Sequence, residues 1–294
     1  MKVHLLDGTY ELFRQHFARP SHVTPDGMEV GGTRGVLDSV VGLLSEGVTH
    51  IGVATDHVIE SFRNDMWPGY KSSAGMPPEL LAQFPLVEDV LGALGLAVWP
   101  MVEVEADDGL AAAAAVAAAD PRVEQVVIMT PDKDLAQCVV DDRVVQLDRR
   151  TGVVSDANGV VKRFGVRPES IPDWLALVGD SSDGFPGLKG WGAKSAAAVL
   201  LRYGHLEDIP HDHWRWDVEV RGATKLAATL NEQRELAWLF RDLATLRTEP
   251  APFATVDELR WTGPTPAFDA IAERLDRPQL VRRAQALAER SMPD

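Results

Sequence analysis

Nine acidic residues either follow short apolar segments or stand within three positions of another acid. They are Asp7, Asp56, Glu105, Asp107, Asp108, Asp132, Asp134, Asp180 and Asp183. Carboxylate oxygens are the ligands that Mg²⁺ and Mn²⁺ prefer, and acids gathered in one place repel one another unless a cation is bound. The pattern therefore predicts a site for divalent metal ions.

The densest group of acids, residues 105–108, comes directly before the alanine-rich run 111–119. Ala and Leu favour helices, so we expect a helix to begin here, with Glu105 and Asp108 on one face and Asp107 beside them. Acids at the start of a helix also complement its dipole, and this explains the group without a metal. The acid pairs further along the chain favour metal binding.

No Cys/His cluster accompanies the acids, which argues against a zinc site. Two Mg²⁺ or Mn²⁺ ions about 3.5–4 Å apart suit the attacking and leaving oxygens of a phosphodiester. The sequence also lacks a Ser/His or Cys/His nucleophile set. We therefore expect metal-dependent hydrolysis without a covalent intermediate.

Short apolar segments in the first half of the chain predict buried strands. These segments are residues 3–6, 50–56, 97–99, 126–130 and 144–147. Helices are expected between them, at residues 36–44 and 80–94, and this alternation predicts an α/β fold with a parallel central sheet flanked by helices. Asp7, Asp56, Asp132 and Asp134 would then converge on the carboxyl edge of the sheet, where ligands bind.

From residue 174 the pattern turns helical, and Asp180 and Asp183 would share one face of this helix. A glycine-rich segment, residues 184–192, then leads into a helix ending near Leu201. The N-terminus of that second helix offers backbone N–H groups to a phosphate. Further helices are expected at residues 225–247 and 277–290, separated by a linker-like stretch.

The formal charge of −15 over 294 residues argues against nucleic-acid binding at first sight. Nine of the negative charges are the candidate ligands, and local basic patches decide phosphate binding. The single cysteine, Cys138, fits a reducing compartment. Asp7 interrupts the apolar N-terminal stretch too early for a signal peptide, and the apolar run 109–119 is too short to span a bilayer. We expect a monomeric, cytoplasmic, nucleoid-associated protein without membrane contact.

Seven motifs in this order resemble those of the 5′-nuclease superfamily, which includes flap endonucleases and the 5′-nuclease domain of bacterial DNA polymerase I. They are Leu6-Asp7-Gly8, Asp56 with Ser61-Phe62-Arg63, Gly69-Tyr70-Lys71, Glu105-Ala106-Asp107-Asp108, Thr130-Pro131-Asp132-Lys133-Asp134, Gly179-Asp180-Ser181-Ser182-Asp183 and residues 186–196. Each motif is weak alone, but the ordered set is specific and covers residues 1 to about 250. Since no polymerase domain follows, the stand-alone form is expected.

The resemblance implies three parts: a PIN-like catalytic domain (1–165) with an arch at about 63–78, a helix–hairpin–helix DNA-binding region (166–250), and a C-terminal tail and helix (251–294). It implies a structure-dependent 5′-3′ exonuclease and flap endonuclease of replication or repair. The expected substrate is DNA with a 5′ flap, a nick or a 5′ end, cleaved with two Mg²⁺ or Mn²⁺ ions.

The resemblance also assigns roles to the individual ligands. Glu105, Asp107, Asp108, Asp132 and Asp134 would hold or flank the first ion, with Asp7 and Asp56 close by, and Asp180 and Asp183 would complete the second.

Arg63 and Lys71 would act in catalysis on the scissile phosphate. The predicted DNA-binding residues are Arg14, Lys189, Gly190, Gly192, Lys194 and Ser195, and carbonyl groups of the glycine hairpin would hold a K⁺ ion. Without the resemblance, these basic residues would be read as solvated surface charges.

Three positions depart from the pattern of the superfamily. Ala74 stands where relatives often carry Arg, Gly184 replaces a common Asn, and Thr55 replaces a usual Phe. None of these changes removes a metal ligand, but the first affects the expected rate and flap steering.

Two alternatives come from other classes of protein. A haloacid-dehalogenase-type phosphatase shares the Asp7-Gly8-Thr9 sequence, but its nucleophilic Asp would stand where this chain has Leu5. A non-catalytic DNA-binding relative would be expected to lose metal ligands, and this chain keeps them. PIN-type ribonucleases share the core but lack the helix–hairpin–helix segment.

Overall fold

The computed structural model describes residues 1–291, which divide into two compact units. The first unit comprises Met1–Ile59, Ser73–Thr130 and the segment from Thr248 onward. The second comprises Glu60–Ser72 and Pro131–Arg247. The acids predicted to bind metal are therefore distributed over both units.

Four parallel strands form the core of the first unit, in the order β3-β2-β1-β4. They are β1 (Lys2–Asp7), β2 (His50–Asp56), β3 (Ala97–Met101) and β4 (Gln125–Met129). β2 is buried along its whole length, as expected for a central strand covered on both faces. Because the strands are parallel, the acids that end β1 and β2 lie at one edge of the sheet.

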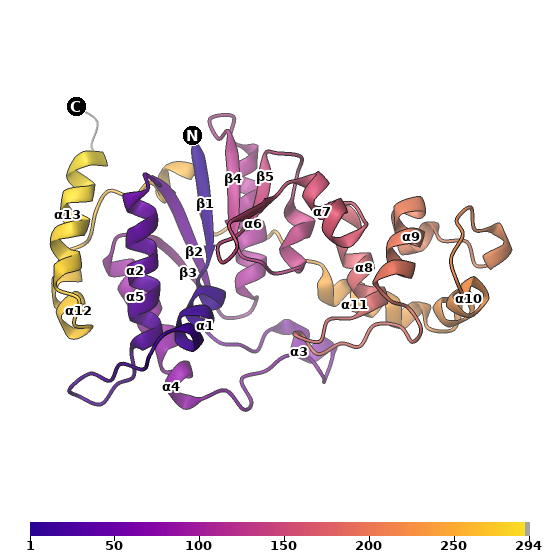
Figure 1. The fold of residues 1–294 in the computed structure, drawn as a ribbon, viewed down its shortest axis with the longest axis horizontal. Helices are drawn as coiled ribbons and strands as arrows, with labels where there is room; N and C mark the ends of the chain where they lie inside the picture. The colour runs from indigo at the N-terminus through magenta and orange to yellow at the C-terminus, as the bar shows by residue number, and fades with distance from the viewer. Residues whose placement is uncertain (292–294) are drawn as a thin grey trace. The chain divides into compact units, whose positions relative to one another are not determined.

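Helices cover both faces of this sheet (Figure 1). α6 (Ala106–Ala119) packs against all four strands on one face, while α1 (Gly8–Ala18), α2 (Gly31–Ser45) and α5 (Gln83–Ala93) pack together on the other. A short helix, α4 (Pro78–Leu81), precedes α5. The small side chains of α6 permit a close approach, since a Cβ at Gly109 would lie 2.5 Å from the Met101 methyl carbon.

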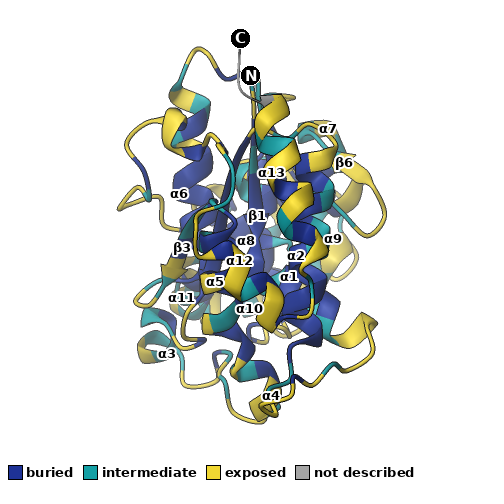
Figure 2. Ribbon diagram, turned by 90° about the vertical axis from the view of Figure 1, so that its left-hand side faces the viewer, coloured by how far each residue is buried: buried dark blue, intermediate teal, exposed yellow. Residues whose placement is uncertain are grey.

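The C-terminal segment contributes η5 (Val256–Leu259), α12 (Phe268–Arg274) and α13 (Gln279–Ser291) to the first unit. The indole of Trp261 donates a hydrogen bond to the Leu94 carbonyl at 2.8 Å, and the ring of Phe253 stacks on Trp99 at 5.6 Å. The sequence of residues 250–266 suggested a linker, but these buried aromatic contacts fasten the stretch to the first unit. Figure 2 shows buried strands and many exposed residues on α13.

The second unit is mainly helical. Its elements are α3 (Phe62–Met66), η1 (Asp134–Cys138), β5 (Val144–Asp148), β6 (Val153–Ser155), α7 (Ala157–Phe164), η2 (Pro168–Ser170), α8 (Ile171–Val178), α9 (Ala193–Tyr203), η3 (Leu206–Asp208), η4 (His213–Arg215), α10 (Ala223–Glu232) and α11 (Arg234–Ala244). Its core includes Trp174, Phe185, Leu188, Trp191 and Phe240. Phe185 and Leu188 belong to the glycine-rich segment, so their burial fixes that segment to the core.

The five predicted strands are confirmed to within two residues at each end. The antiparallel strand β6 was missed, because it has only three residues and no buried position. The predicted helix at 225–247 is two helices, α10 and α11, and the helix at 80–94 is α4 and α5. In the described part of the chain, no helix has both the length and the apolar character needed to cross a bilayer.

Candidate metal centre

In the first unit, two of the predicted acids end neighbouring strands. Asp7 is 6% exposed, and its two carboxylate oxygens accept hydrogen bonds from the Tyr10 N–H at 2.8 Å and the Thr130 hydroxyl at 2.9 Å. Asp56 is 7% exposed and accepts from the Ala106 N–H at 2.8 Å. Each carboxylate thus ties the end of its strand to the helix or strand beside it.

The acidic group before α6 has a structural function that the sequence already suggested. Glu105 is the N-cap residue, and its N–H donates to the Asp108 carboxylate at 3.0 Å, as in a capping box. Both side chains are buried, while Asp107 is half-buried. Asp108 therefore stabilises the helix start.

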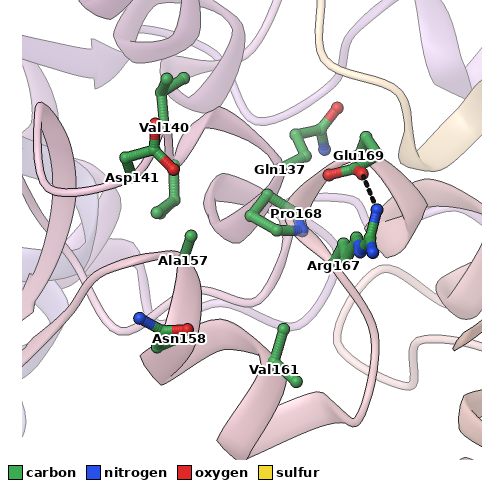
Figure 3. Close-up of a pocket in the computed structure, with 10 residues that line it drawn as sticks. Gln137, Val140, Asp141, Ala157, Asn158, Val161, Arg167, Pro168 and Glu169 are labelled. Carbon is green, nitrogen blue, oxygen red and sulfur yellow. Dashed lines mark ion pairs between the residues drawn. The ribbon is translucent and has the colours of Figure 1, made fainter.

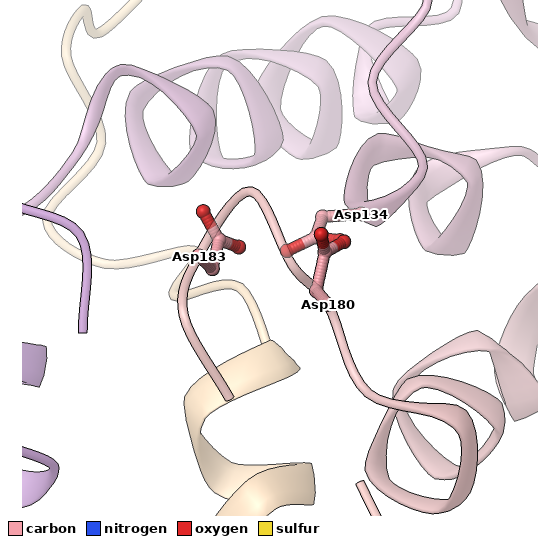
Figure 4. A group of neighbouring side chains, drawn as sticks. All are labelled: Asp134, Asp180 and Asp183. Atoms are coloured by element: carbon pink, nitrogen blue, oxygen red, sulfur yellow. The ribbon is translucent and has the colours of Figure 1, made fainter. Parts of the chain in front are cut away.

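In the second unit, Asp134, Asp180 and Asp183 bring their carboxylates together. One oxygen from each lies within 4.8 Å of the others, a spacing suited to a shared metal ion. Figure 4 shows the carboxylate of Asp183 turned toward those of Asp134 and Asp180. The resemblance had assigned Asp134 to a different ion from Asp180 and Asp183, whereas the geometry groups the three.

A tight turn positions two of these acids. α8 ends at Val178, with Gly179 as its C-cap, and Asp180 and Phe185 exchange backbone hydrogen bonds of 2.9 and 3.0 Å that close the turn. Gly179 and Gly187 have φ angles of 85° and 67°. A Cβ on Gly179 would lie 2.4 Å from the Pro186 carbonyl carbon, and a Cβ on Gly187 would lie 2.4 Å from the Gly179 nitrogen. The prediction that Asp180 and Asp183 share a helix face is therefore wrong; glycine ends the helix before them.

One oxygen of Asp134 carries the strongest indication of a bound cation. Asp134 is 4% exposed, and its buried Oδ1 has no hydrogen-bond partner among residues 1–291. Burial raises the pKa of Asp134 well above its ordinary value, and repulsion from Asp183, Asp132 and Asp180 raises this pKa further. A divalent cation would satisfy the unpartnered oxygen and offset the repulsion, so the residues present fit Mg²⁺ or Mn²⁺.

The segment that carries Lys71 is attached to the same turn. The Lys71 N–H donates to the Asp183 carbonyl at 3.0 Å, and its ammonium lies 3.4 Å from the Asp183 carboxylate. The Trp67 indole donates to the Gly184 carbonyl at 3.1 Å, and Asn64 donates to the Lys71 carbonyl at 2.9 Å. Sequence reasoning missed Trp67 and Asn64, because only a tertiary contact reveals their part in placing Lys71.

Arg63 occupies a different environment from the one predicted for a residue that meets substrate. It is 1% exposed, and its guanidinium donates to the carbonyls of Leu243 at 2.8 Å and Thr245 at 3.2 Å. These bonds anchor α3, a regular helix at the start of the predicted arch at about residues 63–78. Arg63 therefore positions α3 in this structure, and Lys71 is the catalytic candidate that lies beside the acids.

Arg14 also has a local structural partner. Its guanidinium forms hydrogen bonds of 3.0 and 2.5 Å with the carboxylate of Glu11, which is fully buried. This pairing neutralises an acid inside the helix layer. The geometry therefore favours packing for Arg14 over the phosphate contact expected from the resemblance.

The glycine hairpin and the start of α9 present the other predicted DNA-binding residues. Lys189, Gly190 and Lys194 are exposed, and Gly190 has a φ of 89°. The Ser195 hydroxyl accepts from the Gly192 N–H and donates to its carbonyl, both at 3.0 Å. The hairpin and the start of α9 thus offer one exposed ammonium group each, on Lys189 and Lys194.

Two of the sequence departures have a physical explanation. Gly184 has a φ of 81°, and a Cβ there would lie 2.0 Å from the Gly69 carbonyl oxygen, so a larger residue would push the two segments apart. The Thr55 hydroxyl donates to buried Glu88 at 2.8 Å, a partner that Phe could not satisfy. Ala74 is exposed, and nothing in its surroundings explains the change.

A separate cavity of about 510 Å³ in the second unit contains none of the predicted ligands. It is bordered by residues that include Gln137, Val140, Val161 and an ion pair between Arg167 and Glu169 at 4.0 Å (Figure 3). The candidate chemistry therefore lies at the acidic turn, where three carboxylates converge beside Lys71, and not in this hollow.

Comparison with known families identifies the chain. Residues 2–165 match the family described as 5′-3′ exonuclease, N-terminal resolvase-like domain, and residues 166–267 match its C-terminal SAM fold. The chain belongs to the 5′-3′ exonuclease family. This membership confirms the superfamily inferred from the ordered motifs.

Individual relatives extend the comparison. The 5′-3′ exonuclease of Aquifex aeolicus is 31% identical over 243 residues, which are 82% of this chain and 82% of that protein. DNA polymerase I of Pseudomonas aeruginosa is 35% identical over 265 residues, 87% of this chain but only 28% of the polymerase. The chain thus spans less than a third of the length of that polymerase.

A solved structure supports the fold. A bacteriophage T5 flap endonuclease, crystallised as a complex with DNA and metal ions, matches with a TM-score of 0.66 at 17% identity and covers 98% of each chain. This similarity confirms the α/β sheet and the helical C-terminal region expected of a 5′-3′ exonuclease.

We predict that Asp134→Asn removes metal-dependent stabilisation without destabilising the metal-free protein. Wild type should gain about 2.7 kcal/mol when Mn²⁺ is present at 100 times its Kd. The variant, lacking one ligand charge, should gain less than about a third of this, yet be at least as stable in EDTA because repulsion is relieved. Thermal or urea unfolding with Mn²⁺ and with EDTA measures both quantities.

The matched control is Asp141→Asn, which removes an exposed carboxylate from the second unit at a φ of 45° that Asn tolerates. It should keep the full Mn²⁺ increment. An Asp134→Asn variant that retained the wild-type increment would contradict the assignment of Asp134 as a ligand.

Proposed function

We propose that this protein is a divalent-metal-dependent 5′ nuclease that hydrolyses DNA phosphodiesters as a 5′-3′ exonuclease and flap endonuclease. The observation that supports it most is the buried Asp134 Oδ1, which has no hydrogen-bond partner among residues 1–291 and lies beside Asp180 and Asp183, in a chain of the 5′-3′ exonuclease family. The proposed substrates are DNA with a 5′ flap, a nick or a 5′ end, bound by a monomer.

Two groups of acids would each hold one ion, either Mg²⁺ or Mn²⁺. In the first unit the group is Asp7, Asp56, Glu105, Asp107 and Asp108, and in the second it is Asp132, Asp134, Asp180 and Asp183. When bound, such ions activate water and stabilise negative charge on phosphate oxygens.

Lys71 would supply a further positive charge to the reacting phosphate. Its ammonium is a quarter exposed and contacts Asp183, so a small movement of a flexible side chain would transfer it to an anionic oxygen. The backbone bond from Lys71 to Asp183 and the Trp67 indole would hold the lysine at the site. This preorganisation stabilises charge as it develops in the transition state.

Lys189 and Lys194 would contact duplex phosphates, and Gly190, Gly192 and Ser195 would shape the hairpin that presents them. The α9 N-terminus adds backbone N–H groups to this surface. Carbonyl groups of the hairpin are the proposed site for K⁺. The phosphatase alternative loses its basis, because residues 2–165 match a nuclease family and Leu5 stands at its nucleophile position.

The direct test is cleavage of end-labelled 5′-flap, nicked and single-stranded DNA. Wild type should cut the flap and nick substrates with Mg²⁺ or Mn²⁺ and be inactive in EDTA. Asp132→Ala should abolish cleavage while DNA binding largely survives, because Asp132 orders the Asp134 backbone through a 3.1 Å hydrogen bond and adds its own charge. Undiminished activity in EDTA or in that variant would refute the proposal.

For Lys71→Ala, we expect the single-turnover rate on a flap substrate to fall by about 10–1000-fold. The larger values in this range are the loss of rate expected when one hydrogen-bond donor to the transition state is removed. Duplex affinity should change little, because it is assigned to the hairpin. Lys162→Ala, which removes an exposed lysine on α7, serves as the charge-matched control. Equal rates for wild type and Lys71→Ala would refute this role.

The hairpin assignment predicts a change in salt dependence. Lys189→Ala combined with Lys194→Ala should weaken binding to all duplex sequences about equally and lower the slope of log K against log salt by about one unit for each phosphate that is no longer bound. The control double variant, Lys2→Ala with Lys162→Ala, removes the same net charge elsewhere and should keep the wild-type slope. An unchanged slope in the hairpin variant would mean that these lysines touch no phosphate.

A further inference from the structure

Lys133 stands in sequence between two acids of the candidate metal centre and is paired in space with a third. It follows Asp132, precedes Asp134, and its ammonium forms a direct ion pair with Asp180 Oδ2. The Asp180 side chain is 2% exposed, whereas that of Lys133 is 32% exposed. A flexible cation with access to solvent is thus directed into a buried acidic site.

The two lysines near the site contact two of the three clustered acids. Lys133 pairs with Asp180, and Lys71 lies 3.4 Å from Asp183. Within the described residues, Asp134 Oδ1 has no hydrogen-bond partner. Of the three acids, Asp180 therefore has the most direct contact with a lysine ammonium. Asp134 keeps one oxygen available for a cation.

Both oxygens of Asp180 are already engaged. Oδ1 accepts the Ser182 N–H at 2.9 Å, which shapes the turn, and Oδ2 holds Lys133. A divalent ion shared with Asp134 and Asp183 needs an Asp180 oxygen, and Oδ2 is the one whose partner can leave without opening the turn. An ammonium and a divalent cation within a few ångströms also repel each other. The lysine and the metal therefore compete for one oxygen.

We propose that Lys133 is an internal counter-ion: it occupies Asp180 in the protein without metal, is displaced when a divalent ion binds, and thereby lowers the metal affinity of the site. This inference rests on the metal centre proposed above. It gives the lysine two effects of opposite sign, because the same ammonium stabilises the metal-free turn and opposes the metal.

The test compares three variants of the full chain. Lys133→Met keeps the length of the side chain and removes its charge, and Lys133→Arg keeps the charge. Lys162→Met removes the charge of an exposed lysine elsewhere in the second unit. Two quantities are measured for each: the Kd for Mn²⁺, from the free-ion signal in electron paramagnetic resonance, and the Tm in EDTA.

Lys133→Met should bind Mn²⁺ about 10-fold more tightly than wild type, because a competing charge is gone. In EDTA its Tm should fall by about 3–10 °C, since Asp180 loses its buried partner. Lys133→Arg should restore the metal-free Tm and hold the Mn²⁺ affinity at or below that of wild type. Lys162→Met should match wild type in both measurements.

Weaker or unchanged Mn²⁺ binding by Lys133→Met, relative to Lys162→Met, would overturn the inference while leaving the metal centre intact. Wild type that binds no Mn²⁺ would instead overturn the metal centre itself.

A measurement on the wild type keeps the inference testable should Lys133→Met not fold. In lysine side-chain NMR with Mg²⁺, the Lys133 signal, assigned by its absence from Lys133→Arg, should shift while the Lys162 signal stays. A Lys133 signal that does not move while Mg²⁺ binds would overturn the proposed displacement.

Discussion

Repulsion among buried carboxylates is the constraint on which the second unit depends. Asp134, Asp180 and Asp183 lie within ligand distance of one another and are buried, and this burial and the neighbouring carboxylates raise the pKa of Asp134. The turn between Gly179 and Gly187 imposes this closeness through backbone contacts that leave no space for a Cβ. The fold therefore keeps acids together that would separate in a flexible chain, and a cation is the partner that relieves the cost.

The same turn also determines where the catalytic candidate lies. Gly184 approaches Gly69 so closely that a side chain would separate them, and the Trp67 indole and the Lys71 N–H bond to neighbouring carbonyls of the turn. Buried Arg63 fixes α3 through its bonds to the Leu243 and Thr245 carbonyls. The position of Lys71 and the spacing of the acids are thus consequences of one local structure, so a change in the turn would alter both.

Much of this arrangement follows from local sequence patterns. Apolar runs rich in β-branched residues identified the strands, and the acids that end β1 and β2 were placed correctly because parallel strands share a carboxyl edge. The start of α6 was also predictable, since helix propensity and capping are local. These features need only a few neighbouring residues to be specified.

What could not be predicted depends on contacts between distant segments. The helical pattern after Trp174 extends through Asp183, but a glycine pair eight residues apart ends the helix at Val178. Arg63 looked like a surface charge because its partners, the Leu243 and Thr245 carbonyls, lie 180 and 182 positions away. The pairing of Lys133 with Asp180 is likewise invisible to sequence spacing. In each case packing of the second unit overrides the local signal.

In the proposed centre, Asp134, Asp180 and Asp183 together bind one divalent cation. The most direct measurement is the anomalous scattering of Mn²⁺ in crystals of the protein, collected above and below the manganese absorption edge. We expect an anomalous peak within about 2.0–2.6 Å of a carboxylate oxygen from each of the three residues. If crystals with saturating Mn²⁺ showed no peak between these three carboxylates, or a peak that Asp134 does not contact, the shared metal site would be contradicted.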